Sequence, residues 1–143
     1  MPPQIILAGD SAGGNLALGL LSHLTHTHPS LPTTVMAEPL SAVILISPWV
    51  TFNLSAPAMK TKEYKDCLDQ PTLEIWGNAY IGNAPLDNFN CPLNAEANWW
   101  KGLKANRVYI VAGQDEVFID DIAQFAKILK VRHLSLATRT LLL

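Results

Sequence analysis

The chain has 143 residues, of which 49% are hydrophobic and 15% charged, and its formal net charge is −2 at pH 7. This length and composition predict one globular domain, over residues 1–143, with ample material for a core. Because the net charge is small and the basic residues are scattered, we expect no nucleic-acid partner and no binding to an anionic membrane surface. No apolar run reaches the ~20 residues of a membrane span, and we recognise no secretory leader at the N-terminus.

The two cysteines, Cys67 and Cys91, are far apart in the sequence and form no Cys-x-x-Cys pattern. We interpret them as free thiols or as at most one disulfide. This usage favours a reducing compartment such as the cytoplasm.

The first predicted element is a short apolar strand over residues 4–8, which breaks at Gly-Asp-Ser-Ala-Gly over residues 9–13. Leucines and alanines at helical spacing follow at once, so the pattern predicts strand, sharp turn and helix. The turn fits Gly-x-Ser-x-Gly, in which Gly9 and Gly13 let the backbone hold Ser11 in a strained, exposed pose. Ser11 is therefore the candidate nucleophile, and the alternatives are a serine that only caps the helix or a phosphate-binding turn, which Asp10 would disfavour.

The predicted helix runs from this turn to about His26. Five leucines surround most of its circumference, which predicts a helix buried in the middle of a layered fold: Leu16, Leu18, Leu20, Leu21 and Leu24. His23, His26 and His28 cluster near its end, and we interpret them as favourable partners of the helix dipole. Since no cysteine or carboxylate stands beside them, we expect no metal site.

Residues 41–47 form a second continuous apolar run, typical of a strand buried on both faces of a parallel sheet. Strand, helix and strand at this spacing predict a β-α-β unit with a right-handed crossover. From about residue 50 to 103 long periodicity is lost, and we interpret this segment as an excursion from the sheet. Within it, Asp69 can cap a helix that begins near Pro71 and places Leu73, Trp76 and Tyr80 on one face.

Residues 107–113 predict a third strand, whose carboxyl end should lie at the same edge of the sheet as Ser11. The next helix, from about residue 119 to 130, has an apolar stripe, acidic residues at its start and lysines at its end, which suits a helix dipole. After Lys130 we recognise no further strand, and we expect an atypical tail over residues 131–143. His133 is interpreted there as a surface histidine.

Three segments carry a resemblance to a known family. Gly-Asp-Ser-Ala-Gly-Gly-Asn-Leu-Ala at residues 9–17 resembles the nucleophile elbow of the α/β-hydrolases that include hormone-sensitive-lipase-like and fungal acetyl-ester esterases. Ile-Ser-Pro-Trp at residues 46–49 is similar to that family's next strand end, and residues 113–121 are similar to its acid loop, Asp-x-Leu-x-Asp. The resemblance implies a three-layer α/β sandwich with a mostly parallel sheet, part of an α/β-hydrolase fold.

The resemblance also implies roles for individual residues. Ser11 would attack an ester carbonyl, and the backbone amide of Ala12 would donate to the oxyanion. If Asp120 matches the last aspartate of the acid loop, the carboxylate that orients a histidine is Glu116, with Asp115 as the alternative one residue earlier.

Two parts of the family pattern find no match in this chain, namely the His-Gly-Gly-Gly loop before the elbow and the Gly-His loop after the last helix. We expect a carboxylic-ester hydrolase acting on small acyl or acetyl esters, without a cofactor; the alternative is an inactive hydrolase-like binding domain or a truncated isoform. A sheet that lacks a neighbour for its first strand should also expose a hydrophobic edge.

Overall fold

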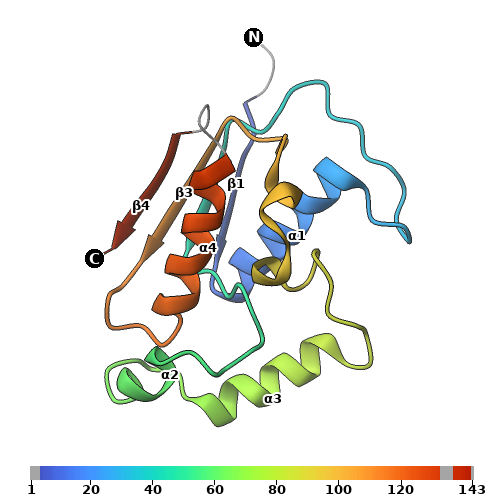
Figure 1. Cartoon of the computed structure of the whole chain (residues 1–143). Helices are drawn as coiled ribbons and strands as arrows, with labels where there is room; N and C mark the ends of the chain where they lie inside the picture. Colours follow the sequence, from blue (N-terminus) through green and yellow to red (C-terminus); the bar gives the residue numbers. More distant parts are fainter. Residues whose placement is uncertain (1–3, 133–136, 143) are drawn as a thin grey trace.

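The computed structural model describes residues 4–132 and 137–142, and its centre is a four-stranded, all-parallel sheet (Figure 1). The strands lie in the order β1-β2-β3-β4, the same as their order along the chain. Their bounds are Ile6–Asp10, Ala42–Ile46, Arg107–Ala112 and Ala137–Leu142. The predicted class, α/β with a parallel sheet, is confirmed.

The fourth strand corrects the sequence analysis, which placed no strand after Lys130 and an atypical tail over residues 131–143. Residues Ala137–Leu142 pair with β3 in parallel, from Arg107 opposite Ala137 to Ala112 opposite Leu142. The polar residues at 138–140 interrupt the apolar run and hide the strand from a hydrophobicity pattern. Two of them are threonines, whose branched side chains favour extended backbone. His133 lies outside the described residues.

Two long helices connect the strands and cover one face of the sheet. Helix α1, Ala12–His26, joins β1 to β2, and helix α4, Ile119–Arg132, lies between β3 and β4 (Figure 1). Because crossovers between parallel strands are right-handed and the strands follow chain order, both helices pack on the same face. Their fully buried side chains meet those of β2 and β3 in one core: Leu18, Leu21, Ile122, Phe125, Val43, Leu45, Val108 and Ile110.

The opposite face of the sheet is partly open, so the described residues form two of the three expected layers. Ile6 and Ile46, which point to that face, are 59% and 45% exposed. The expected hydrophobic edge at β1 is confirmed, since Ile5 is also about half exposed. The prediction that the leucines of α1 are buried around most of the helix is wrong for Leu16 and Leu20, which are 58% and 46% exposed.

Residues between β2 and β3 form the predicted excursion, which contains the short helix α2, Ala58–Thr61, and the longer helix α3, Gln70–Ile81. Asp69 caps α3 as expected, since its Oδ1 accepts a hydrogen bond of 2.9 Å from the Thr72 N–H. Hydrogen bonding by the Thr72 side chain and, to a lesser extent, by the Thr72 N–H lowers the pKa of Asp69. Two 3-10 turns, Pro92–Asn94 and Ala97–Trp100, return the chain to the core.

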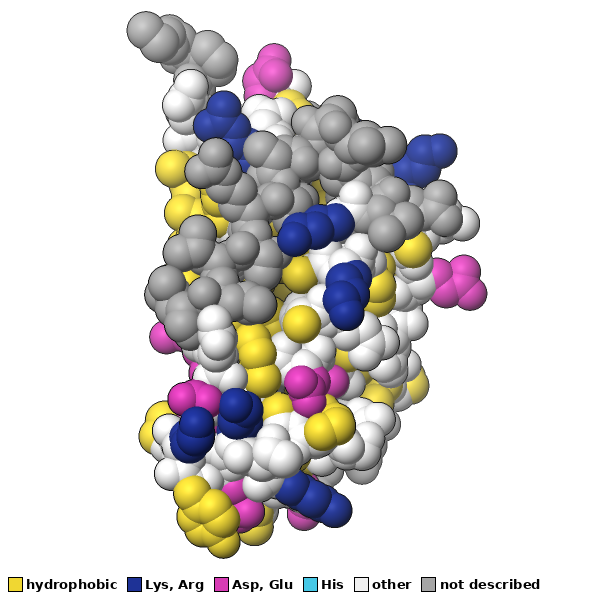
Figure 2. All heavy atoms as spheres, turned by 60° about the vertical axis from the view of Figure 1, so that its left-hand side comes forward, with side chains coloured by type: hydrophobic (Ala, Val, Ile, Leu, Met, Phe, Trp, Pro, Cys, Tyr) yellow, Lys and Arg dark blue, Asp and Glu magenta, His cyan; other side chains and the backbone are white. Residues whose placement is uncertain are grey.

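The end of the excursion is anchored by Trp100, which is fully buried and meets the Phe125 ring edge-on at 5.1 Å. Cys91 is buried and Cys67 is exposed, and both are free thiols. Charged side chains are dispersed over the face shown in Figure 2 and do not gather in one patch. Within residues 4–132 and 137–142, no helix is long and apolar enough to cross a membrane.

Candidate active site

The turn between β1 and α1 places Ser11 in a backbone conformation that few side chains adopt. Its φ is 53° and its ψ is −117°, a strained region for any residue except glycine. Gly9 is required for this turn, because a Cβ there would lie 2.1 Å from the carbonyl oxygen of Gly13. A Cβ on Gly13 would meet nothing within 4 Å in the described part of the chain.

Main-chain hydrogen bonds lock the backbone of Ser11. Its N–H donates to the Ile46 carbonyl at 2.9 Å, and its own carbonyl accepts from the N–H groups of Gly14 and Trp49, each at 3.0 Å. The side chain of Ser11 makes no capping hydrogen bond to α1, so the geometry does not support the interpretation that it only caps the helix. Ala12 is the first residue of α1, and its N–H therefore has no acceptor within the helix.

Three strand ends meet at the edge that carries Ser11. In the register of the sheet, Asp10 lies beside Ile46, and Ile46 lies beside Val111. The residues that follow these positions therefore come from three distant parts of the sequence to one edge, as the sequence analysis predicts for parallel strands. Ser47, directly after β2, lies between the two loops.

Glu116 is held in the loop after β3, residues 113–117, which we name the acid loop. Its Oε1 accepts a hydrogen bond of 2.6 Å from the Ser47 hydroxyl and one of 2.7 Å from the Gly113 N–H. Its Oε2 is buried and has no hydrogen-bond partner among the described residues. Ser47 itself has a positive φ of 43°. One carboxylate oxygen is thus fixed, and the other remains able to accept a proton donor.

Asp115, the alternative acid, has a different environment. Its side chain is 57% exposed and pairs with the ammonium groups of Lys62 and Lys65, each at 2.9 Å. These two hydrogen bonds lower the pKa of the Asp115 carboxyl. The neighbouring carboxylates therefore differ, because Glu116 is directed to Ser47 and Asp115 to the lysines around α2.

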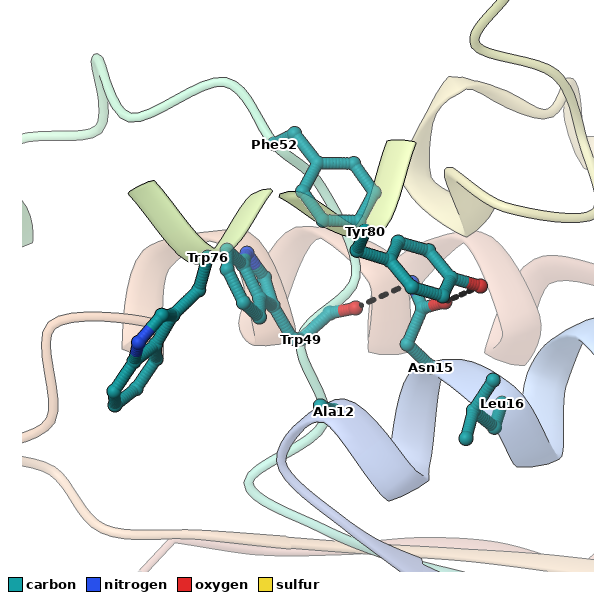
Figure 3. A pocket seen from close by; sticks show the side chains of 7 residues that line it. All are labelled: Ala12, Asn15, Leu16, Trp49, Phe52, Trp76 and Tyr80. Carbon is teal, nitrogen blue, oxygen red and sulfur yellow. Dashed lines mark hydrogen bonds between the residues drawn. The ribbon is translucent and has the colours of Figure 1, made fainter. Parts of the chain in front are cut away.

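A cavity of about 220 Å³ lies beside the elbow and beneath α3 (Figure 3). Most of its lining is aromatic or aliphatic, and the residues are Ala12, Asn15, Leu16, Trp49, Phe52, Trp76 and Tyr80. Asn15 is buried, and its amide donates to the carbonyls of Trp49 and Asn90, each at 2.9 Å. Asn15 Oδ1 accepts from the Tyr80 hydroxyl at 3.4 Å. Burial and, to a lesser extent, the Asp87 carboxylate raise the pKa of Tyr80, which keeps the phenol protonated.

The histidines of the described residues lie at the far end of α1. The N–H of His28 donates to His23 Nδ1 at 3.0 Å, and His26 stacks on Trp99 with ring centroids 3.9 Å apart. His23 is eleven residues beyond Ala12 along the helix, a distance of about 16 Å at 1.5 Å per residue. In the part of the chain that the structure describes, no group of three or more His, Cys, Asp and Glu could hold a metal ion.

The first turn of α4 contains a buried carboxylate that the sequence analysis left unassigned. Asp120 Oδ2 accepts a hydrogen bond of 2.8 Å from the Ala58 N–H and thereby ties α2 to α4. Asp121 is only 9% exposed, and its Oδ2 has no partner within residues 4–132 and 137–142. Burial and the nearby Asp120 charge raise the pKa of Asp121 to about 6.

Sequence reasoning missed two residues that build the site. Ser47 was noted only within a strand end similar to the family's, although a hydroxyl directly after a buried strand is a signal for this edge. Asn15 was noted only as part of the elbow pattern. A polar residue in the first turn of an apolar helix could have indicated its role, since a buried amide must find partners.

The fold, the elbow and the acid loop together define an α/β-hydrolase, and the comparison with known families agrees. The alpha/beta hydrolase fold family matches residues 1–139, so the chain belongs to this family. The similar proteins are named as an acetyl hydrolase and as esterases.

One curated relative and two solved structures show the extent of the similarity. Steryl acetyl hydrolase 1 of Saccharomyces cerevisiae is 30% identical over 126 residues, which cover 80% of this chain and 28% of the yeast protein. An esterase of the bacterial hormone-sensitive lipase family matches 96% of this chain and 43% of its own, with a TM-score of 0.75 and 23% identity. The esterase EstE5, soaked with p-nitrophenyl butyrate, matches with a TM-score of 0.74, 24% identity and coverage of 96% and 42%. The chain thus spans less than half the length of these relatives.

Proposed function

We propose that this chain carries the nucleophile and the orienting carboxylate of a serine carboxylic-ester hydrolase. One observation carries the proposal: the strained Ser11 and the half-bonded Glu116 come to the same edge of the sheet from loops that follow β1 and β3. Serine hydrolases of this fold place these two groups in that way, in the order serine and then acid along the chain.

In the proposed reaction, Ser11 Oγ attacks the ester carbonyl carbon and gives its proton to a base. The Ala12 N–H donates to the oxygen that becomes negative, and the alcohol leaves with the proton from the base. Water then attacks the acyl-enzyme and releases the acid. Glu116 orients the base through its free Oε2, a role for which the lysine-paired Asp115 is poorly directed. No histidine of the described residues lies at this edge, so the mechanism requires a base from outside them.

Small acyl esters, and acetyl esters first, are the proposed substrates. The family resemblance of the elbow supports this, as does the name of the yeast relative, a steryl acetyl hydrolase. Hydrolysis of p-nitrophenyl acetate should therefore exceed hydrolysis of the corresponding octanoate.

A second candidate function is binding of an ester or alcohol without catalysis. The observation that favours it is the position of His23, His26 and His28 at the far end of α1, about 16 Å or more from the elbow. Such a domain would retain the cavity beneath α3 and lack turnover.

The test is hydrolysis of p-nitrophenyl acetate together with labelling by a fluorophosphonate probe. If the chain is catalytic, Ser11→Ala abolishes labelling and lowers the rate at least about 10³-fold, whereas the exposed loop variant Ser30→Ala leaves both unchanged. If the wild-type chain is folded by circular dichroism and shows neither labelling nor turnover, catalysis by this chain is excluded and the binding function is favoured.

A further inference from the structure

The cavity beneath α3 carries an inference about the substrate, which rests on the proposed function. Ala12 lies in the cavity wall and directly follows Ser11 in the sequence (Figure 3). A substrate group that binds in the cavity therefore lies close to the ester carbonyl that Ser11 would attack. The other walls come from Trp49 and Phe52 after β2 and from Trp76 and Tyr80 on α3.

The cavity offers no charge, and among the described residues that line it the buried polar atom without a hydrogen-bond partner is Trp49 Nε1. Both N–H groups of the Asn15 amide are used by the carbonyls of Trp49 and Asn90, and its oxygen accepts from the Tyr80 hydroxyl. A ligand with several polar groups would therefore lose most of its hydrogen bonds to water without replacement, which is unfavourable. The lining therefore favours a mainly apolar occupant.

Three of the aromatic side chains in the walls, Trp49, Phe52 and Tyr80, hold one another in place. The rings of Trp49 and Phe52 are 5.0 Å apart, and Phe52 stacks on Tyr80 at 5.8 Å. Trp49 also stacks on the buried Phe118, with ring centroids 5.5 Å apart. Rigid aromatic faces favour planar or cyclic partners, because offset stacking and edge contacts add to simple burial.

The volume sets the size of the occupant. A dry apolar cavity of about 150 Å³ takes up benzene, so a larger cavity is needed for a second ring. At about 220 Å³, this cavity accommodates one or two fused rings. Trp76 and Tyr80 are each about half exposed at its mouth, and a ring bound there would bury part of their surface.

We propose that this cavity binds a ring-bearing part of the ester, an aryl or alicyclic group of one or two rings. Trp76 and Tyr80 determine this specificity, since they form the wall that α3 contributes. A linear alkyl group of comparable size loses more rotational freedom on binding and gains less from flat walls, and it therefore binds more weakly.

The test measures binding without turnover, on the full chain carrying Ser11→Ala. 2-Naphthol and 1-octanol are titrated separately, and the indole N–H signals of the four tryptophans are followed by two-dimensional NMR. We expect saturable shifts of Trp49 and Trp76 with 2-naphthol, and binding of 1-octanol weaker by about tenfold. Trp99 and Trp100, which do not line the cavity, should not shift.

Two variants on α3 locate the site. Trp76→Ala should weaken 2-naphthol binding by about tenfold, and Trp76→Phe should restore most of it. The matched control is Ile75→Ala, one residue away on the exposed side of the same helix and 68% exposed. It should leave the affinity unchanged.

The inference is overturned if the folded protein shows no saturable binding, if 1-octanol binds as tightly as 2-naphthol, or if Trp76→Ala and Ile75→Ala behave alike. Failure of the proposed function would appear differently, as ring binding with no labelling or hydrolysis. Conversely, hydrolysis that depends on Ser11 without ring binding would overturn only the assignment of the cavity.

Discussion

The elbow follows β1 and the acid loop follows β3, and both lie at the same edge of the sheet. They are nevertheless built in different ways. The elbow takes its shape from the backbone, through the absence of a Cβ at Gly9 and the main-chain hydrogen bonds of Ser11. The acid loop takes its shape from side chains, because Glu116 bonds to the Gly113 N–H and to the hydroxyl of Ser47, 69 residues earlier. A loop whose shape depends on the backbone can be predicted from the local sequence. A loop whose shape depends on side-chain contacts also requires knowledge of a distant partner.

The largest expected effect concerns the elbow, whose shape depends on the backbone at Gly9. Gly9→Ala places a Cβ 2.1 Å from a carbonyl oxygen that cannot move without breaking the elbow. We expect a loss of more than about 3 kcal/mol in the free energy of unfolding, or failure to fold. Gly13→Ala, measured in the same urea titration, should be neutral or stabilising by up to about 1 kcal/mol, since alanine favours a helix and the space is open. Equal effects of the two variants would contradict this account of the elbow.

The next largest effect tests the hydrogen bond between Ser47 and Glu116, which holds the acid loop. Glu116→Gln and Ser47→Ala each remove part of a charge-assisted hydrogen bond and should each lower the unfolding free energy by about 1 to 3 kcal/mol. In a double-mutant cycle, the two losses should be less than additive by about 1 kcal/mol or more. Strict additivity would show that the bond between Ser47 and Glu116 does not organise the loop.

A smaller effect concerns the turn of α4 that follows the acid loop. The pKa of Asp121 is raised to about 6 in the folded protein. Between about pH 4 and pH 6 the folded state holds a proton that the unfolded state has released, so this group makes stability fall as pH rises through that window. Asp121→Asn should remove this fall and stabilise the protein at pH 7 by on the order of 1 to 2 kcal/mol. A difference between variant and wild type that stays constant from pH 4 to 7 would contradict the assignment.

The smallest effect is expected at Asp115, one residue from Glu116. Asp115→Asn removes two exposed ion pairs, which water and salt already screen. The melting temperature should hardly change in 0.15 M salt. If Asp115→Asn destabilised the protein as much as Glu116→Gln, the distinction between the two carboxylates would be lost.

Local patterns were sufficient to predict the three apolar strands, the two long helices and the capped helix α3. Each of these depends on residues that are close in sequence, such as Asp69 with Thr72. The fourth strand was missed because its three consecutive polar residues, 138–140, give no apolar run, and its pairing with β3 is not shown by any local pattern. The exposure of Leu16 and Leu20 was missed because a helical pattern reports which residues are apolar but not what covers them.

In the candidate site, too, the residues that depend on local sequence could be predicted and those that depend on distant partners could not. Ser11 and Ala12 could be identified from the Gly-x-Ser-x-Gly pattern, and the acid could be narrowed to two neighbours. The partners that distinguish Glu116 from Asp115 lie 50 to 69 residues away, in Ser47, Lys62 and Lys65. The cavity beneath α3 could not be derived from sequence, because its walls combine three segments whose packing is decided only in the folded chain.

The match between strand order and chain order also has a consequence for assembly at the ribosome. Among the four described strands, each one from β2 onwards adds to the edge left by the strand before it, so none of these four waits for a later one to fill a gap between them. Folding can therefore follow synthesis from the N-terminal end, with the elbow formed as soon as β2 supplies the Ile46 carbonyl to Ser11. The acid loop is completed only when β3 has emerged and docked, and the nucleophile is in place before its orienting partner.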